Sequence, residues 1–460
     1  MRSLWTKDQA VAATAGTCTV DWQASGVSID TRSLQKGDLF VALTDLRDGH
    51  DFVAQALEKG AVAALVSQVP DGVSADAPLL IVDDVLQGLE AMARAARVRI
   101  SGKVIGVTGS VGKTGSKEML RTALSKQARV HAAESSYNNH WGVPLTLARM
   151  PQDTEFAIIE IGMNHAGEIG PLARMADLDV ALITTVAPVH LAAFSGVEEI
   201  ADAKAEIFEG LKHGGTAVLN ADIDTLPILR DAADAANAQI VTFGSAKDAN
   251  FRLLGAYVSD DATKVSFDLA GQKVDYTLAA PGAHLAMNSL AVLAVCDAVG
   301  VELNYCIANL AAWTTPAGRG RRETVQMNNG IAIELIDEGF NANPTSMAAA
   351  LDVLAQRQAK GRKVVIMGDM LELGITEKTL HKEMADLPSL KDMDVIHLVG
   401  PLMKQLYAVL PVELRGLWLE NADDATQIID HLKPHDIVMV KGSKGSKVSK
   451  IVDAIRKTSA

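Results

Sequence analysis

The chain has 460 residues, 48% of them hydrophobic and 22% charged, and its 43 basic and 56 acidic residues give a formal net charge of −13. This composition excludes a largely disordered chain, and the length predicts roughly two to four domains. The acidic balance disfavours a general nucleic-acid-binding surface, so anions would have to be bound by local groups.

The number and spacing of the cysteines, together with the first residues, predict the cellular compartment of the protein. Cys18, Cys296 and Cys306 are far apart in the sequence and fit no metal-ligand spacing, and the last two lie in apolar, helix-like stretches. Such a sparse, odd number suits a reducing compartment and core packing. The first residues lack the apolar core of a signal peptide, and no stretch approaches the roughly 18 apolar residues of a membrane span. We expect a cytoplasmic protein with neither a membrane span nor a nucleic-acid partner.

Short apolar strands alternate with helices over residues 1–100. Strands are predicted at GDLFVAL and LLIV, and a long helix follows the second of them. Ser101 and Gly102 then interrupt the pattern before the strongly apolar KVIGVTG. We therefore place the first domain boundary near residue 100.

Residues 101–313 carry several buried-strand candidates with helices between them, namely KVIGVTG, FAIIEIGMN, VALITTVAP, GGTAVLNAD and AQIVTFG. This alternation predicts a parallel sheet with helices on both faces. Residues 251–280 change to the alternation of a small antiparallel meander, and two helices follow. The Pro/Gly-rich, basic run TTPAGRGRRE marks a second boundary near residue 314.

Residues 314–460 hold four more strand candidates, IAIELIDE, KVVIMGD, VIHLVG and DIVMVKG, again separated by helices. This pattern predicts a second doubly wound unit of the Rossmann type. The expected fold is therefore α/β with three domains. They are a small N-terminal α/β domain, a central doubly wound parallel sheet with a phosphate loop and a small antiparallel sheet, and a C-terminal Rossmann-like domain.

The sharpest motif, GVTGSVGKTGSKEML, follows an apolar strand and opens a helix. Its GxxGKT loop consists of Gly109, Ser110, Val111, Gly112, Lys113 and Thr114. Glycines let the backbone approach phosphate oxygens, and a helix N-terminus directs N–H groups at an anion. Lys113 is expected on the β- and γ-phosphates and Thr114 on Mg²⁺. The usual GxxxxGK[ST] spacing is absent because residue 107 is valine, and an ordinary Gly-rich turn is the alternative.

Three ionisable residues follow in the middle segment. Glu160 ends a very apolar strand, where a charge is costly unless it is paired or bound to a metal. His190 follows another buried strand, and Lys204 lies on a predicted helix. A solvated strand end, a capping or core histidine and a solvated helix face are the ordinary alternatives. Placed beside the phosphate loop, the three residues predict a Mg²⁺–phosphate site.

Polar loops provide further candidates. Asn138 and Asn139 in SSYNNHWGVPLTL suit a polar loop, although a turn with self-bonded Asn side chains is the alternative. Asp337 ends a strand of the third domain, and the turn that follows contains Asn341 and Asn343 before a predicted helix. This arrangement predicts a second anion pocket.

The last strand leads into a basic, Gly-rich loop with Lys441, Ser443 and Lys444. Such a loop is a candidate for binding a carboxylate or a phosphate. A solvated loop near the chain end is the alternative.

Taken in order, these motifs resemble the Mur ligase family. VSIDTRSLQKGDLFVAL with RDGHDF is similar to its nucleotide-sugar-binding N-terminal domain, and VTGSVGKT is similar to its phosphate loop, whose spacing is shortened. YNNHWGVPLTL, EIGMNHAGEI, APVHLAAFSGVEEIADAKAEIF, FNANPTSM, GDMLELG and VKGSKGSKV match in the same order. The pairing of FNANP with GDMxELG points to the member that adds D-alanyl-D-alanine to UDP-N-acetylmuramoyl-tripeptide with ATP, the last cytoplasmic step towards the pentapeptide precursor of peptidoglycan.

The resemblance implies residue roles. Lys113, Glu160, His190 and Lys204 are the expected catalytic residues. Thr114, Glu160 and His190 would hold or neighbour Mg²⁺, and Lys204 matches a lysine that is carbamylated (N6-carboxylysine) in relatives. The other positions are assigned by ligand: Asn288, Arg319 and Asp337 to ATP; Thr31 and Arg32 to the uridine nucleotide; and Asn138, Asn139, Phe340, Asn341, Asn343 and Lys441 to substrate, with Asn341 near the incoming dipeptide.

Some positions depart from the family pattern. Leu285 replaces the first Asn of a GxHNxxN run, which removes one expected polar contact near the adenine. Gly339 and Phe340 stand where relatives have serine and tyrosine, so the two hydroxyl groups of the family pattern are missing here. Thr44 and Asp45 follow GDLFVAL, where relatives usually have a Gly.

The implied reaction runs through an acyl phosphate. The substrate carboxylate attacks the γ-phosphate of ATP, and the amino group of D-Ala-D-Ala then attacks the acyl carbon. ATP contacts from two domains require closure, with Thr314–Arg322 as the expected hinge. We expect a monomer. The rivals are a ligase for a single amino acid, a folylpolyglutamate synthase, a P-loop NTPase switch and an inactive scaffold.

Overall fold

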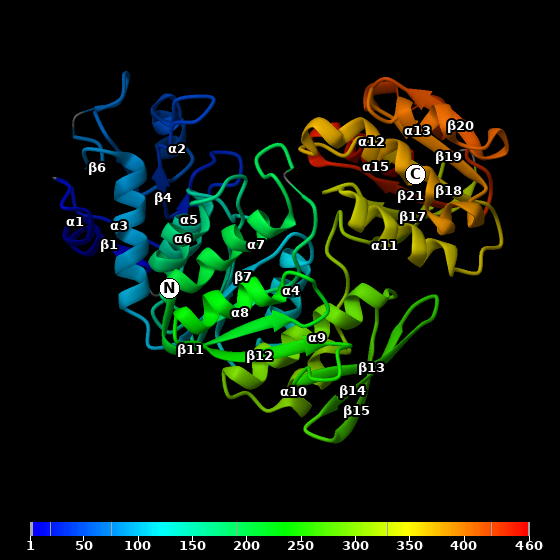
Figure 1. Cartoon of the computed structure of the whole chain (residues 1–460). Helices are drawn as coiled ribbons and strands as arrows, with labels where there is room; N and C mark the ends of the chain where they lie inside the picture. The colour runs from blue at the N-terminus through cyan, green and yellow to red at the C-terminus, as the bar shows by residue number, and fades with distance from the viewer. Residues whose placement is uncertain are drawn as a thin grey trace.

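The computed structural model describes residues 3–18, 20–74, 76–189, 191–328, 330–424 and 426–458. Its three larger sheets lie at the centres of three successive parts of the chain, coloured from blue to red in Figure 1. We call these parts the N-terminal unit (Trp5–Val98), the central unit (Lys103–Leu310) and the C-terminal unit (Arg321–Lys457). The predicted α/β fold class is confirmed. No helix in the described ranges combines the length and apolar character needed to cross a membrane.

The N-terminal unit has a parallel sheet in the order β3 (Gly26–Ser28), β4 (Asp38–Val41), β5 (Ala63–Val66) and β6 (Leu79–Ile81). A short antiparallel pair, β1 (Trp5–Thr6) and β2 (Gln23–Ala24), accompanies it, with helices α1 (Lys7–Thr14), α2 (Val53–Glu58) and α3 (Val85–Val98). The Asp84 carboxylate caps α3 by accepting a hydrogen bond from the Gln87 amide. Helix α3 packs on the central unit beside α5 (Gly142–Ala148) and α6 (Ile169–Ala176), as Figure 1 shows.

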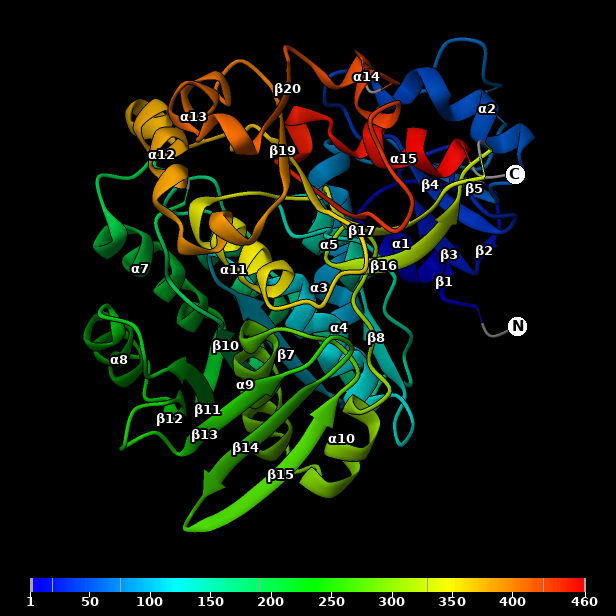
Figure 2. The same cartoon turned by 90° about the vertical axis from the view of Figure 1, so that its right-hand side faces the viewer.

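The central unit contains a nine-stranded sheet in the order β15-β14-β13-β12-β11-β10-β7-β9-β8. Its parallel strands are β7 (Lys103–Thr108), β8 (Val130–Ala132), β9 (Phe156–Glu160), β10 (Leu178–Ile183), β11 (Leu211–Asn220) and β12 (Gln239–Gly244). The predicted meander is β13 (Phe251–Val258), β14 (Thr263–Leu269) and β15 (Gln272–Leu278). Because β13 also pairs with β12, in parallel, the meander extends the main sheet and does not form a sheet of its own (Figure 2).

Helices cover both faces of this sheet, which explains the unbroken apolar strands. One apolar core includes Val104 of β7 and contacts α6 and α7 (Val197–Ala205). The other includes Ile105 of β7 and contacts α4 (Lys113–Leu124), α9 (Ala283–Ala298) and α10 (Leu303–Leu310). Cys296 and Cys306 lie in this second core, as predicted. Helix α8 (Leu226–Ala235) packs beside β11 and β12.

The C-terminal unit has six strands in the order β16-β17-β21-β18-β19-β20. They are β16 (Arg321–Gln326), β17 (Ala332–Glu338), β18 (Lys363–Gly368), β19 (Val395–Val399), β20 (Arg415–Leu419) and β21 (Ile437–Lys441), of which β16 is antiparallel to its neighbour. The α-helices are α11 (Pro344–Ala355), α12 (Glu377–Glu383), α13 (Lys404–Val409), α14 (Thr426–Ile429) and α15 (Ser449–Lys457).

Candidate active site

The phosphate loop lies where β7 ends and α4 begins. Gly109 and Gly112 have φ angles of +144° and +89°, in the region that disfavours side chains. Neighbours also require glycine here. A Cβ atom at Gly109 would lie 2.0 Å from the Thr184 Oγ1, and one at Gly112 would lie 3.0 Å from the Asn288 Oδ1. The backbone at this helix N-terminus therefore stays open to an anion.

Lys113 is the first residue of α4, and its ammonium curls back to donate a hydrogen bond to the Gly109 carbonyl within the loop. Burial lowers the pKa of Lys113, the field of Glu160 opposes this shift, and the positive charge of Arg319 adds to it. An anion bound beside such a desolvated ammonium would strongly stabilise its charged form.

An oxygen-rich cluster lies directly beside the loop. The Thr114 hydroxyl is 3.0 Å and 2.9 Å from the two carboxylate oxygens of Glu160, and 3.0 Å from the Ser136 Oγ. The Asn138 amide donates to Glu160 Oε1 at 2.9 Å. Glu160 is only 2% exposed, so the solvated strand-end alternative is excluded. The cluster brings residues from α4, β9 and the loop after β8 to one point.

Lys204 lies near the end of α7 and is 2% exposed, which excludes the alternative of a solvated helix face. Burial lowers the pKa of Lys204 well below its usual value, and the positive charge of Lys113 acts in the same direction. Within the described ranges, the Lys204 ammonium has neither a hydrogen bond nor an ion pair. Among the described residues of the central unit, Lys204 is thus a buried lysine without an anionic partner.

The C-terminal unit contributes to the same place. Arg319, in the segment before β16, donates to the Ser136 hydroxyl at 3.3 Å and lies over the Phe340 ring at 4.3 Å. Burial lowers the pKa of Arg319, while the carboxylates of Glu160 and Glu338 oppose this shift. The two units also touch at Gly374, where an added Cβ would lie 2.8 Å from the Leu191 carbonyl oxygen. This structure therefore brings the two units together around the phosphate loop.

Comparison with known proteins gives the chain its family. Three family models match it in succession: the Mur ligase family catalytic domain at residues 23–97, the Mur ligase middle domain at 107–296 and the Mur ligase glutamate ligase domain at 320–444. Among curated proteins, UDP-N-acetylmuramoyl-tripeptide–D-alanyl-D-alanine ligase from Rickettsia prowazekii is 34% identical and covers 93% of this chain and 94% of its own length. The enzyme of the same name from Bacillus subtilis is 33% identical, with 93% and 92% covered. The chain belongs to the Mur ligase family.

Solved structures agree with this assignment. A crystal structure of MurF from Acinetobacter baumannii matches with a TM-score of 0.85 at 28% identity, covering 98% of this chain and 99% of that one. MurF from Thermotoga maritima, solved in complex with ADP, matches with a TM-score of 0.78 at 25% identity, covering 94% and 97%. The three-unit arrangement described above is thus that of a Mur ligase.

The predicted site residues of this Mur ligase fall into groups. Lys113, Thr114, Glu160, Asn138 and Arg319 are brought together, and Asn288 lies against Gly112. Ser110 and Val111 anchor the loop, because the Ser110 hydroxyl donates to the Ala187 carbonyl and the Val111 carbonyl accepts from the Thr184 hydroxyl. His190 lies outside the described residues.

In the C-terminal unit, the predicted residues hold the turn after β17. The Asp337 carboxylate pairs with Arg456 at 3.0 Å, and the Asn343 side chain caps α11 by accepting from the Ser346 amide. Lys441 donates to the Asn341 carbonyl at 3.0 Å and to Glu338 at 3.2 Å. The predicted alternative of a solvated loop is excluded for Lys441, which is buried.

Other predicted residues lie apart from the cluster or serve the backbone. Thr31 and Arg32 belong to the N-terminal unit, where the Thr31 hydroxyl donates to Gln55 and Arg32 pairs with Asp30 at 2.6 Å. The Asn139 side chain accepts from the Gly142 amide, as the turn alternative predicts. Ser136 is the residue that sequence reasoning missed, since a serine within SSYNN carries no signal that distinguishes it from its neighbour.

A cavity of about 680 Å³ lies beside α4, between the central unit and the segment that leads into β16. Glu118 and Thr122 of α4 line it on one side, and Pro281, Trp313 and Thr315 line it on others. Its volume falls in the range of small-molecule sites.

Proposed function

We propose that this Mur ligase joins D-alanyl-D-alanine to UDP-N-acetylmuramoyl-tripeptide at the expense of ATP. The observation that carries the proposal is the junction at Ser136. There, the phosphate-loop residue Thr114 and Arg319, from the segment that leads into the C-terminal unit, contact the same hydroxyl. A reaction between an ATP-activated carboxylate and an amine needs such a meeting of two units. The names of the relatives give the substrates.

The three units divide the binding work in this proposal. The N-terminal unit, with Thr31 and Arg32, binds the uridine nucleotide, and the central unit binds ATP. The C-terminal unit, with Asn341 and Lys441, binds the dipeptide. The cavity beside α4 has room for the nucleoside part of ATP. The protein acts as a monomer in the cytoplasm, which size-exclusion chromatography with light scattering and cell fractionation would test.

The chain's own charges suit phosphoryl transfer. The tripeptide carboxylate attacks the γ-phosphorus of ATP, the bond to the bridging oxygen breaks and ADP leaves. Lys113 and Arg319 stabilise the charge that spreads over the transferred phosphoryl oxygens. The dipeptide amine then attacks the acyl carbon and loses a proton, and phosphate leaves as the amide forms.

The oxygen cluster fits Mg²⁺. No group of three or more His, Cys, Asp or Glu side chains suited to a metal occurs among the residues that the structure describes. Mg²⁺ is commonly bound by one or two carboxylates together with substrate phosphates, and Glu160 with Thr114 offers such an incomplete oxygen set. When bound, the ion would neutralise phosphate charge. Glu160 and Thr114 would hold it only with ATP present.

The surroundings of Lys204 support the proposal that this lysine is carbamylated. A lysine with a lowered pKa presents a neutral amine, which attacks CO₂ to form a carbamate and releases one proton. The product places an anion where the neutral amine stood, in the field of the Lys113 cation, which improves the local charge balance. Carbon-13 NMR in labelled bicarbonate would detect the carbamate in the parent, and its absence there would contradict this assignment.

The decisive experiment measures ADP release and detects the product by mass. UDP-N-acetylmuramoyl-tripeptide and ATP are supplied with D-Ala-D-Ala, with a single amino acid, or with no acceptor. The proposal expects the pentapeptide only with the dipeptide. ADP release that ignores the dipeptide would instead favour an NTPase, and a product with the single amino acid would favour another ligase of the family.

A further inference from the structure

Lys117 is a buried charge that the proposed reaction does not use. It lies on α4 one turn after Lys113, and its side chain is 0% exposed. Its ammonium donates to the Ala133 carbonyl at 2.6 Å and to the Ser135 carbonyl at 3.4 Å, and it lies 3.1 Å from a carboxylate oxygen of Glu118. A buried ammonium is retained only where such partners compensate for lost hydration.

The two carbonyls belong to a segment without regular structure. Residues 133–139 follow β8 and form neither helix nor strand. The Gly162 amide donates to the Asn138 carbonyl at 2.8 Å and holds the end of the segment, whereas the described residues 133–136 lack such a backbone bond to a neighbouring strand. Yet this segment carries Ser136, which contacts Thr114 and Arg319, and Asn138, which donates to Glu160. The position of Ser136 therefore depends on what holds the first part of the segment against α4, and Asn138 follows it two residues later.

Lys117 is placed to do this. Its three N–H groups are directed at two carbonyls of the segment and at Glu118, which itself lines the cavity beside α4. Because the Lys117 side chain is buried, its contacts to the segment are direct and not mediated by bulk solvent. An apolar residue of the same length would fill the space but leave both carbonyls without this donor.

We propose that Lys117 is a positioning residue of the Mg²⁺–nucleotide site. It holds residues 133–139 against α4, so that Ser136 and Asn138 orient Thr114 and Glu160. The inference rests on the proposed function only in taking this cluster as the place where Mg²⁺ and nucleotide bind. Lys117 itself touches no reacting atom.

The test compares Lys117→Met with a matched variant, Arg97→Met. Arg97 is also a buried cation that donates to backbone carbonyls, but at the opposite end of the same sheet. We expect Lys117→Met to raise the Kd of ADP with Mg²⁺, measured by calorimetry, about 10-fold to 100-fold, as loss of an outer-shell partner does at metal sites. Arg97→Met should leave this Kd unchanged. Hydrogen exchange should quicken in residues 133–139 of the Lys117 variant alone.

Two further variants test the proposal even if Lys117→Met does not fold. Lys117→Gln retains an amide donor and should give a smaller rise in Kd. Ser136→Ala, made in the parent chain, should weaken Mg²⁺–ADP binding, and its effect should be smaller in a Lys117→Gln background than in the parent. Parent-like binding in a folded Lys117 variant, or in Ser136→Ala, would overturn the proposal. A parent that binds Mg²⁺–ADP but makes no pentapeptide would instead count against the proposed function alone.

Discussion

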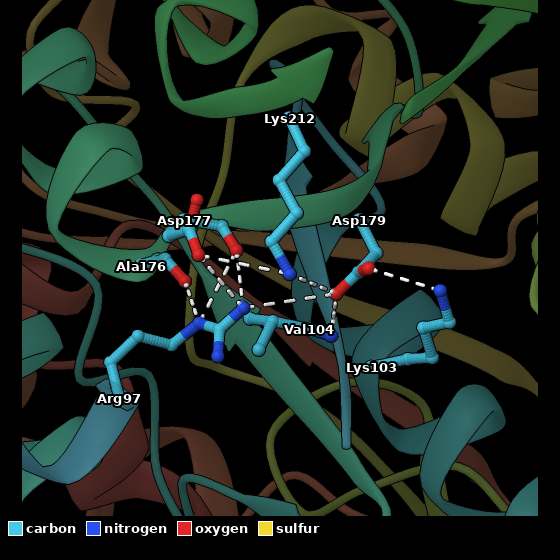
Figure 3. Close-up of polar contacts among 7 residues, drawn as sticks. All are labelled: Arg97, Lys103, Val104, Ala176, Asp177, Asp179 and Lys212. Atoms are coloured by element: carbon cyan, nitrogen blue, oxygen red, sulfur yellow. Dashed lines mark hydrogen bonds and ion pairs between the residues drawn. The ribbon is translucent and has the colours of Figure 1, made fainter. Parts of the chain in front are cut away.

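The two ends of the central sheet differ in how their charged side chains are paired. At the end where β7 and β10 begin, Asp179 accepts a hydrogen bond from the Val104 amide and pairs with Lys103 at 3.2 Å and Lys212 at 3.1 Å (Figure 3). Arg97 of α3 donates to two carbonyls there and pairs with Asp177 at 3.0 Å. Burial raises the pKa of Asp179, but these hydrogen bonds outweigh it and leave the pKa below its usual value.

At the other end, where the parallel strands finish, the described cationic side chains outnumber the carboxylates that could pair with them. Lys204 is buried, and Lys113 and Arg319 are half-buried. Within the central unit a single carboxylate, that of Glu160, acts on the pKa values of Lys113 and Arg319. A satisfied network stabilises the fold, whereas unsatisfied cations cost stability and favour anionic ligands. The contrast separates the end that packs against the N-terminal unit from the end where we propose that the nucleotide binds.

The substitution that should test this contrast with the largest effect is Lys113→Met. We expect kcat to fall about 10³-fold, because one preorganised cation at the transferred phosphoryl group is lost. The melting temperature should hold or rise, since the variant no longer buries a desolvated charge. ADP release and calorimetric scanning measure the two effects. Lys103→Met, at the opposite end, serves as the control and should keep parent-like kcat. A large fall in melting temperature for Lys113→Met would contradict the contrast.

Arg97→Met should give the reverse result. Loss of two carbonyl hydrogen bonds and an ion pair is expected to lower the free energy of unfolding by about 2–3 kcal/mol. Because Arg97 joins α3 to the central unit far from the phosphate loop, KM for ATP should not change. Urea unfolding and steady-state kinetics measure both. A raised KM without lost stability would show that the two ends are coupled.

The pH dependence of the free energy of unfolding gives a further test of the comparison at Lys204. Burial lowers its pKa below 10.5, so between the lowered pKa and 10.5 the unfolded chain binds a proton that the folded chain does not. Stability from this group therefore rises with pH across that window. In CO₂-free buffer, Lys204→Met should be more stable than the parent at neutral pH, and the difference should shrink towards pH 10.5. Equal pH slopes for the two chains, measured by urea unfolding, would contradict an unpartnered buried lysine.

Sequence reasoning found much of the site, for a physical reason. Glu160 at the end of an apolar strand and Lys113 after a glycine loop carry local signals, because burial and phosphate binding constrain neighbouring residues. Lys117 and Ser136 carry none, since their partners lie in other segments and a lysine in KTGSKEM is typical of an exposed helix face. The parallel pairing of β12 with β13, two consecutive strands, was not predicted either. Long-range partners have no local pattern, and the structure alone reveals them.

The smallest expected effect concerns the contact that brings Arg319 to the phosphate loop. Gly374 has φ +64°, and an added Cβ would lie within 3 Å of the backbone of Leu191 and Ala192. Gly374→Ala should therefore separate the C-terminal and central units and lower kcat/KM several-fold, with the larger part in KM for ATP. Gly72→Ala is the matched control, because Gly72 also has a positive φ, +76°, but no atom within 4 Å of its Cβ position. Equal losses in both variants would assign the effect to backbone strain. A loss confined to Gly374→Ala would show that the phosphate-loop end of the sheet depends on its contact with the C-terminal unit.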